Sequence, residues 1–468
     1  MDDLALTGYL DRSKERILGT LVEWLRIPSI SAHPERTGDV AASAEFCAGM
    51  LRDAGLEAVS ILPAGRLGEP GQGAPAVYGE WLGAGPGAPT VLVYGHHDVQ
   101  PVDPLERWNS PPFEPKVSGN ELWARGCSDD KGQVLMQVEA ARGLLAEHGA
   151  LPVNLKILIE GEEEVGSPHF EDLLQRERER LRADVVVVSD TTMEAVDVPS
   201  TTVSMRGLVA FDVTVRTADE DLHSGIWGGT VPNAALVVAR MAAGLHDADG
   251  RVSIPGFYAD VRELSEAETR SLASIPFDEA EFCRTAGVRY LEGERGRSAY
   301  ERTGARPTAE IVGLHAGYGG PGIKTIVPAS ATLKVAMRLV PDQVPARIAR
   351  AFEQWARATA PAGVEITLAS SGGVAPLVTP VDHPAVQILS GAIERVWGKV
   401  PLYTRSGGSG PEEALARVLD APLIFFGIAL PNDNFHAPNE RLDLGQLWRG
   451  TICAGELLLG LRSLGAAA

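Results

Sequence analysis

Short apolar runs that alternate with helical stretches constrain the fold of this chain most strongly. The runs lie at residues 90–94, 153–159 and 185–189, and a helical stretch at 133–148 separates the first two. Continuous apolar strands that alternate with helices predict a mostly parallel sheet with both faces covered. Ligands of such sheets bind at the carboxyl ends of the strands, so we expect functional side chains there.

The pattern changes near residue 206 and changes back near residue 380. The expected elements between these positions are strands at 208–215, 331–339 and 364–369 and helices at 232–246 and 344–360. They predict an antiparallel sheet with helices on one face. A helix at 384–397 and a strand at 422–428 then resume the first pattern. We therefore predict a discontinuous α/β domain, residues 1–205 and 381–468, with an inserted α+β domain, residues 206–380.

Other segments have simpler expectations. Helical spacing predicts an amphipathic helix that stops before Pro28 and a second helix at 40–54. Residues 63–89 are rich in glycine and proline, which predicts a surface loop. Residues 247–313 are charged and irregular, and they indicate no function.

Charge and cysteine usage narrow the class of partner. A formal charge of −20 argues against nucleic acid or an anionic membrane as partner, because both would be repelled. Small ligands or cations are the expected partners.

The acidic N-terminal stretch lacks the features of a signal peptide, and no apolar run is long enough for a membrane span, so we expect a cytoplasmic protein. The four widely spaced cysteines are expected to be reduced thiols.

The motif GHHDVQP, residues 95–101, follows the first apolar strand. Successive strand side chains alternate in direction, so His96 and Asp98 share one side and His97 faces away. A metal-bound histidine is commonly oriented by a nearby carboxylate. We therefore predict His96 as a metal ligand and Asp98 as its partner.

Two further motifs concentrate carboxylates. Asp129, in RGCSDDKG, has two oxygens that could bridge two cations held about 3.5–4 Å apart. EGEEEVGS begins at residue 160, and its run of carboxylates is unfavourable unless cations or solvent compensate. One glutamate could bind metal while its neighbour acts as general base. Asp190, after the strand at 185–189, and His436, in NFHAPNE, are further candidates.

Each motif alone has a structural interpretation. A glutamate cluster can be a solvated face, a strand-end histidine can be structural, and Asp129-Asp130 can form a turn with a helix cap. Cys127 lies beside the predicted bridge, but no histidine is placed by pattern to activate it as a nucleophile. The motifs occur together, in chain order, at predicted strand ends, and this favours a metal centre.

Together the motifs resemble the co-catalytic zinc peptidase family that includes aminoacylase, glutamate carboxypeptidase and carnosinase. The resemblance covers nearly the whole chain and is strongest to the cytosolic non-specific dipeptidase and carnosinase branch. It rests on GHHDVQP, WNSPPF, RGCSDDKG, EGEEEVGS, Ser189-Asp190, DLHSG and RLVP.

This resemblance implies a zinc-exopeptidase-like catalytic domain and an inserted ferredoxin-like lid domain that forms a homodimer. It implies two divalent ions, zinc or manganese. His96 and Asp190 would hold one ion, Glu164 and His436 the other, and Asp129 would bridge both. Glu163 is the implied general base, which takes a proton from the attacking water and returns it to the leaving amine.

Residues outside this cluster are implied to contact the substrate. His223, in DLHSG, would reach the partner subunit's active site as an oxyanion donor, and Arg338, in RLVP, would pair with the substrate's terminal carboxylate. Ser409, Thr325 and His383 are weaker candidates for substrate contacts. The structural alternatives are a surface histidine, a strand-surface ion pair, and turn or packing residues.

The predicted activity is hydrolysis of dipeptides or short peptides. One alternative is an N-acyl-amino-acid deacylase or desuccinylase with the same metal centre, and another is a metal-binding scaffold without catalysis. The mixed histidine and carboxylate ligand set suits zinc and manganese alike.

Overall fold

The structure is a computed structural model that describes residues 5–66 and 68–466. The chain divides into two compact units. Unit 1 contains the residues up to Val203, Thr379–Thr404 and the residues from Gly410 onward, and unit 2 contains Ser204–Val378 and Arg405–Ser409. The short segment that carries Ser409 therefore belongs with unit 2, although the chain on both sides of it belongs to unit 1.

The central sheet of unit 1 has the strand order β1-β4-β8-β5-β9-β19. Its strands are β1 (Glu57–Leu62), β4 (Ala76–Trp81), β5 (Thr90–His96), β8 (Asn154–Glu160), β9 (Val185–Val188) and β19 (Leu423–Phe425). β5 pairs in parallel with β8 and β9, and β9 with β19, whereas β4 pairs antiparallel with β1 and β8. Every residue of β8 and β9 is buried. Because successive side chains point to opposite faces, both faces are covered there, as predicted.

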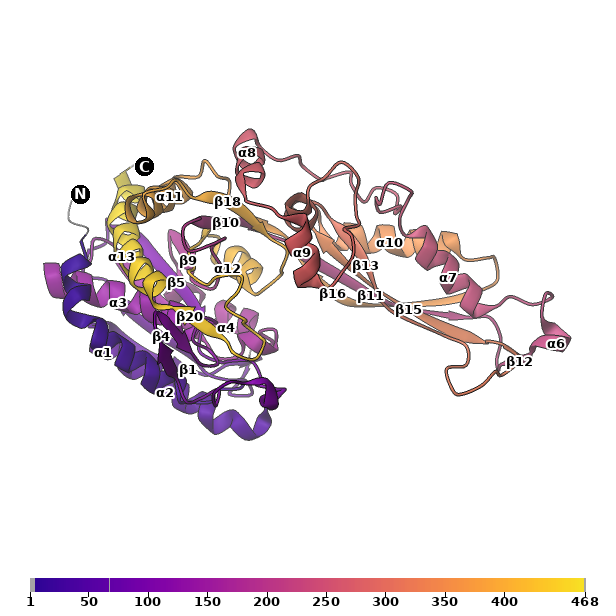
Figure 1. The fold of residues 1–468 in the computed structure, drawn as a ribbon, viewed down its shortest axis with the longest axis horizontal. Coiled ribbons are helices and arrows are strands. Elements are labelled where there is room, and N and C mark those ends of the chain that lie inside the picture. Colours follow the sequence, from indigo (N-terminus) through magenta and orange to yellow (C-terminus); the bar gives the residue numbers. More distant parts are fainter. Residues whose placement is uncertain (1–4, 67, 467–468) are drawn as a thin grey trace. The chain divides into compact units, whose positions relative to one another are not determined.

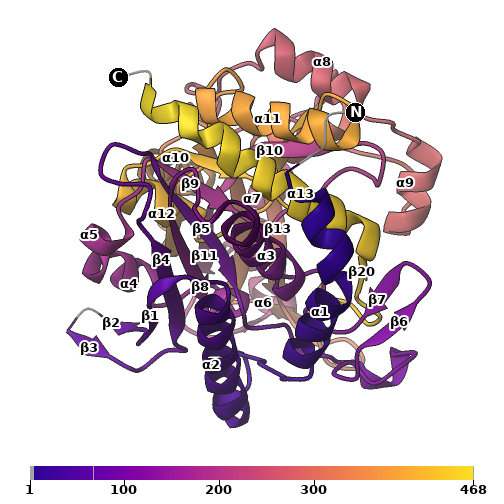
Figure 2. The same ribbon diagram turned by 90° about the vertical axis from the view of Figure 1, so that its left-hand side faces the viewer.

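Helices provide this cover (Figures 1 and 2). They are α1 (Thr7–Leu25), α2 (Thr37–Asp53), α3 (Lys131–His148), α4 (Phe170–Arg176), α5 (Arg178–Leu181), α11 (Pro384–Trp397), α12 (Glu412–Leu419) and α13 (Leu444–Leu461). α3 packs on β5 and against α1 and α13, and α12 packs on β9 and against α4. Figure 2 shows α3 beside α1 and α13, so the first and last helices share one core. None of the helices within the described residues is long and apolar enough to cross a bilayer.

Shorter elements complete unit 1. They are β2 (Gly65–Arg66), β3 (Glu69–Pro70), β6 (Lys116–Ser118), β7 (Glu121–Trp123), β20 (Arg441–Asp443) and the 3-10 turn η3 (Glu163–Val165). β20, β7 and β6 form a small antiparallel sheet. β10 (Ser200–Met205) and β18 (Leu402–Ser406) contain two of the four positions where the chain passes between the units.

The prediction of a surface loop over residues 63–89 is wrong for its central part. Ala76–Trp81 forms β4, which lies between β1 and β8, and Ala76, Val77 and Tyr78 are buried. Glycines and prolines on both sides dominate the composition of the segment. A strand of six residues is too short to overcome that signal in a composition window.

Unit 2 has an antiparallel sheet with the order β13-β15-β11-β16. Its elements are β11 (Gly207–Arg216), β12 (Leu222–His223), α6 (Ser224–Trp227), α7 (Ala234–Gly244), α8 (Glu266–Ser274), α9 (Glu279–Ala286), η4 (Glu301–Ala305), β13 (Thr308–Ala316), β14 (Ile326–Val327), β15 (Ser330–Leu339), α10 (Pro345–Thr359), β16 (Glu365–Val374) and β17 (Leu377–Val378). The chain order β11-α7-β13-β15-α10-β16 is a ferredoxin-like βαββαβ arrangement, as predicted.

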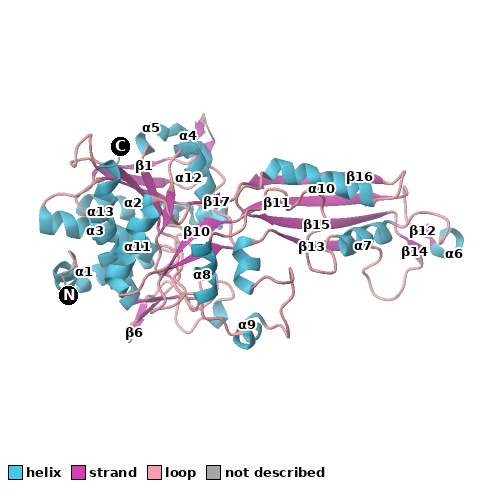
Figure 3. Ribbon diagram, turned by 90° about the horizontal axis from the view of Figure 1, so that it is seen from above, coloured by secondary structure: helices cyan, strands magenta, loops and turns pink. Residues whose placement is uncertain are grey.

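One face of this sheet is covered. Burial alternates along β15, so its odd and even side chains lie in different environments. α7 packs on β11, β13 and β15, and α10 packs on β11 and β16 and against α7. Figure 3 shows β13 at one edge of the sheet and β16 at the other. β13 is therefore an edge strand.

Candidate metal centre

The ends of three neighbouring strands bring the predicted metal-binding residues together in unit 1. His96 ends β5, Glu160 ends β8, and Asp190 follows β9. β5 is parallel to both neighbours, and His96 is in register with Glu160. The carboxyl ends of these strands therefore meet at one edge of the sheet, which is where such folds bind ligands.

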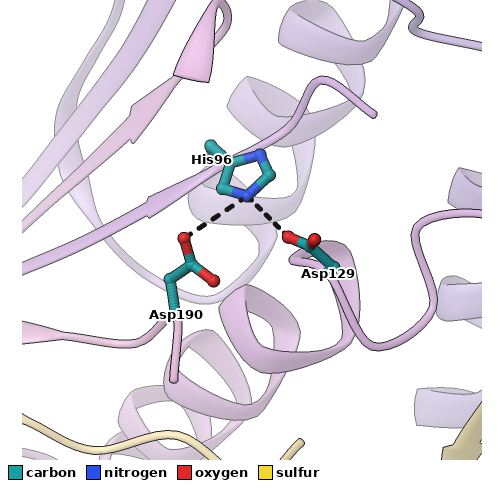
Figure 4. A group of neighbouring side chains, drawn as sticks. All are labelled: His96, Asp129 and Asp190. Atoms are coloured by element: carbon teal, nitrogen blue, oxygen red, sulfur yellow. Dashed lines mark hydrogen bonds and ion pairs between the residues drawn. The ribbon is translucent and has the colours of Figure 1, made fainter. Parts of the chain in front are cut away.

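A first group consists of His96, Asp129 and Asp190 (Figure 4). His96 Nε2 lies 3.0 Å from Asp129 Oδ1 and 3.6 Å from Asp190 Oδ2. One possible ligand atom of each residue lies within 4.8 Å of the other two. A nitrogen with two carboxylate oxygens is a donor set that suits a divalent cation.

Asp129 belongs to a second group, with Glu164 and His436. His436 Nε2 lies 3.0 Å from Asp129 Oδ2 and 3.2 Å from Glu164 Oε2. Asp129 thus directs Oδ1 toward His96 and Oδ2 toward His436. A carboxylate that bridges two cations needs one oxygen on each side, and Asp129 has this arrangement.

Asp98 is fully buried beside the first group and organises the backbone around it. Its carboxylate accepts hydrogen bonds from Ser31 Oγ at 2.5 Å and from the N–H groups of Glu163 and Glu164 at 3.2 and 3.1 Å. Its Oδ1 also lies 3.4 Å from His96 Nδ1. Asp98 therefore orients the His96 ring and holds η3, the turn that carries both glutamates.

His97 and Gln100 complete the GHHDVQP motif in different ways. His97 Nε2 lies 2.9 Å from the carbonyl oxygen of Pro75, and burial lowers the pKa of His97 to about 4. Its ring thus points away from the metal-binding groups, as the alternation of a strand predicted. Gln100 Nε2 donates to Glu164 Oε2 at 2.7 Å and helps to fix that carboxylate.

Electrostatics at this edge favour bound cations. Burial raises the pKa of Glu163 to about 9, with further contributions from neighbouring carboxylates, and burial raises the pKa of Asp190 to about 7. Hydrogen bonds to Asp129 and Glu164 raise the pKa of His436 to about 10. The carboxylates therefore repel one another when ionised, and divalent cations would remove that repulsion. The donor set and its charge fit a pair of such ions.

Cys127 has none of the features of a nucleophile. Burial raises the pKa of its thiol well above the usual range, and Sγ donates to the carbonyl of Leu122 at 3.4 Å. A buried thiol that stays protonated is a poor nucleophile.

The substrate-contact candidates of unit 2 form two pairs. His223 and Thr325 lie together, because β12 pairs with β14 and the N–H of Ser224 donates to the Thr325 carbonyl at 3.0 Å. His223 is exposed, and its Nδ1 accepts the N–H of Gly225 at 3.0 Å. In the other pair, Arg338 Nη1 donates to Ser409 Oγ at 2.8 Å.

Arg206 joins the second pair, although the sequence did not single it out. Ser409 Oγ donates to the Arg206 carbonyl at 2.6 Å, and Arg206 Nε donates to the Gly407 carbonyl at 3.0 Å. Burial, and then the charge of Arg338, lowers the pKa of Arg206 to about 10. A single arginine between two strands belongs to no recognisable sequence motif. Its position beside Arg338 is therefore visible only in the folded structure.

His383 lies in unit 1, at the N-terminus of α11. Its Nδ1 accepts the N–H of Ala385 at 3.2 Å, so the ring caps that helix. This contact gives His383 a structural role, and a substrate contact stays a prediction.

Comparisons with known proteins agree with this geometry. A sequence profile described as Peptidase family M20/M25/M40 matches residues 92–459. The chain is 27% identical to Beta-Ala-His dipeptidase of Homo sapiens, covering 97% of this chain and 92% of that protein. It is 28% identical to Cys-Gly metallodipeptidase DUG1 of Candida albicans, covering 97% and 96%. The crystal structure of the M20 family metallo-carboxypeptidase Sso-CP2 from Sulfolobus solfataricus matches with a TM-score of 0.81 at 30% identity, covering 95% of this chain and 99% of that one.

The profile covers well over half of the chain, and the similar proteins match it nearly end to end. The motifs that we assigned to metal binding all lie within the matched residues. This chain therefore belongs to peptidase family M20/M25/M40 and is a metal-dependent hydrolytic enzyme.

Proposed function

We propose that this protein is a dipeptidase that hydrolyses dipeptides or short peptides with a two-metal centre in unit 1. The observation that carries the proposal is Asp129, whose two oxygens face His96 and His436 on opposite sides. The names of similar proteins support the substrate class, since they include dipeptidases from Homo sapiens and Candida albicans.

Two zinc or manganese ions fit the ligands proposed. His96 and Asp190 would hold one ion, Glu164 and His436 would hold the other, and Asp129 would contribute one oxygen to each. When bound, the pair of ions would polarise the peptide carbonyl and make the attacking water more acidic. His96 Nδ1 lies against the carboxylate and the backbone carbonyl of Asp98, so Nε2 is the nitrogen available for a metal.

Glu163 is the general base of the proposed reaction. It takes a proton from the attacking water and returns that proton to the amine that leaves. Support comes from its place in η3, where Asp98 holds its N–H, and from the charges of Asp190, Glu164 and Asp129 that act on its carboxyl group. Because Glu164 is the adjacent residue, one short turn supplies both the proposed base and a proposed ligand.

Arg338 binds the terminal carboxylate of the substrate in this proposal. Arg206 and Arg338 lie close enough for the charge of Arg338 to lower the pKa of Arg206. A carboxylate would relieve the repulsion between two guanidinium groups and accept their hydrogen bonds. The Ser409 hydroxyl accepts a hydrogen bond from Arg338 Nη1 and donates one to the backbone carbonyl of Arg206, and so it positions this anion site.

We also propose that unit 2 forms a homodimer and that His223 acts on the active site of the partner subunit. The edge strand β13 exposes the apolar side chains of Ile311, Val312 and Leu314, which favours pairing with a second chain. His223 Nδ1 accepts a backbone hydrogen bond, so a neutral ring carries its proton on Nε2 and can donate to an oxyanion. Light scattering should find dimers, and Val312→Lys should shift them toward monomers.

A cytoplasmic location completes the proposal. The four cysteines are all unpaired, and Cys47, Cys127 and Cys453 are buried as free thiols. Free thiols persist in a reducing compartment. Fractionation of the native cells, with detection of this chain by antibody, tests the location.

The activity test is a substrate screen with the metal-free protein and each metal added back. We expect hydrolysis of dipeptides and little turnover of N-acetyl or N-succinyl amino acids. Cleavage of the acylated compounds alone would identify a deacylase instead. Stoichiometric metal binding without turnover of any compound would identify a scaffold.

A further inference from the structure

Asp129 and His436 come from parts of the chain about three hundred residues apart, yet their segments are tied together by buried polar groups. The central group is Glu440, four residues after His436 in NFHAPNE. Its side chain is fully buried, as is that of Arg125, which begins the motif RGCSDDKG. Neither residue has a role in the chemistry proposed above.

The Glu440 carboxylate accepts four hydrogen bonds from the segment that carries Asp129. Oε1 accepts the N–H groups of Ser128 and Asp129 at 2.9 and 3.1 Å. Oε2 accepts the N–H of Gly126 at 2.8 Å and Arg125 Nη1 at 2.7 Å. Charge-assisted hydrogen bonds of this kind are stronger than neutral ones, so the 125–129 loop is held firmly.

A second buried carboxylate, Asp433, holds the same loop from the other side of His436. Its Oδ2 accepts Ser128 Oγ at 2.9 Å and the N–H of Leu430 at 2.8 Å. Arg125 Nη2 also donates to the carbonyls of Pro101 and Ala437, at 3.1 and 3.2 Å. The chain before His436 and the chain after it are therefore both fastened to the Asp129 loop.

The backbone at His436 needs such support. His436 has a φ of +61°, and Asn434 and Asn439 have φ of +58° and +65°. Left-handed conformations are uncommon for residues other than glycine, although asparagine and histidine adopt them more readily than most, and surrounding contacts stabilise them. The contacts of Asp433 and Glu440 lie at both ends of this left-handed segment.

We propose that Glu440 is a positioning residue that sets the distance between Asp129 and His436 and so determines the affinity of the metal centre. The inference rests on the proposed function, because it takes these two residues as metal ligands. Glu440 itself contacts neither ion in this proposal. It acts through Asp129, whose N–H it holds, and through Arg125, which contacts the segment of His436.

Glu440→Gln tests the role with little change in volume. The four groups around the carboxylate are all donors. The amide NH₂ of glutamine would face two of them in either orientation, so two hydrogen bonds are lost. We expect the affinity for Zn²⁺ alone, measured on the full chain by competition with a chromogenic chelator, to fall by about 10–100-fold.

Glu139→Gln is the matched control, because it alters a buried carboxylate of the same unit that pairs with an arginine outside the metal-binding groups. Glu139 has a fully buried side chain, lies 2.6 Å from Arg16 Nη2, and accepts the hydroxyl of Tyr9 at 2.7 Å. Both variants should lower the melting temperature, but Glu139→Gln should leave zinc affinity within about 3-fold of the wild type. Equal loss of affinity in both variants, or none in Glu440→Gln, would overturn the proposal.

Two variants at Asp433 test the same role if Glu440→Gln does not fold. Asp433→Ala removes the acceptor of Ser128 Oγ, whereas the side-chain oxygen of Asp433→Asn can accept both hydrogen bonds. Zinc affinity should fall in the alanine variant and be largely restored in the asparagine variant. Identical affinities in the two variants would refute the positioning role. Failure of the wild-type protein to bind zinc would instead refute the metal centre of the proposed function.

Discussion

Two proposed functional residues of unit 1 and two of unit 2 lie in opposite environments. In unit 1, His96 and Asp98 are fully buried, and the Asp98 carboxylate accepts hydrogen bonds from the backbone N–H groups of the turn η3. In unit 2, His223 and Thr325 are exposed, on the short strand pair β12–β14 and its flanking turn. The positions of these two unit 1 residues are thus set by the core of that unit. The exposed residues can contribute to catalysis only when a substrate or a partner subunit lies against them.

This difference separates two kinds of contribution to catalysis. Side chains locked by packing and hydrogen bonds are preorganised for a transition state, so their loss should mainly lower turnover. Side chains on an exposed surface bind the substrate or complete the active site of a partner subunit. The effect of removing them on activity should therefore depend on the substrate or on the partner subunit. The following substitutions test that division.

Glu163→Gln should have the largest effect. We expect turnover to fall by about 10²–10⁴-fold with bound metal unchanged, because the base is not a ligand. Metal analysis beside dipeptide kinetics measures both quantities. Glu164→Gln is the adjacent control and should lose metal as well as activity. An active Glu163→Gln enzyme would contradict the assignment of the base.

His223→Ala should lower turnover by about 10²–10³-fold, as expected for loss of one oxyanion donor. Mixing the His223→Ala protein with the Glu163→Gln protein tests whether His223 acts across subunits. In a mixed dimer, the subunit with intact Glu163 receives intact His223 from its partner, so part of the activity should return. No recovery on mixing, with heterodimers present, would show that His223 does not act across subunits.

Arg338→Met should act mainly on binding. The lost charge-assisted hydrogen bonds should raise KM by about 10–100-fold with a smaller change in kcat. Dipeptides with a C-terminal amide lack the carboxylate, so the variant and the wild type should handle them alike. A variant that loses kcat equally on both substrates would place Arg338 in the chemical step instead.

The smallest expected effect concerns stability and pH. Burial raises the pKa of Glu163 from an ordinary 4.5 to about 9. Between these values the folded metal-free protein binds more protons than the unfolded chain, so this group lowers stability as the pH rises. Glu163→Gln removes the titration. Its melting temperature should therefore exceed that of the metal-free wild type by a few degrees at about pH 8 and hardly at about pH 5. A pH-independent difference would show that Glu163 does not titrate in this window.

Much of unit 1 could be predicted because its signals are local. The apolar run at 90–94 became β5, Thr90–His96, and the helix expected at 133–148 became α3, Lys131–His148. A buried parallel strand must be apolar along its whole length, and a histidine or carboxylate directly after it is visible as an interruption. β4 was missed because it is only six residues long and its neighbours are turn residues.

The sequence by itself determined which residue types could bind metal and where each follows its strand, because side-chain direction and strand ends are local properties. The tertiary structure alone decided that Asp129 presents one oxygen to each histidine, that Glu440 and Asp433 fasten the His436 segment to the Asp129 loop, and that Arg206 joins Arg338. These contacts join residues separated by tens to hundreds of positions. Their distances depend on how the chain closes between them, and no local pattern contains that information.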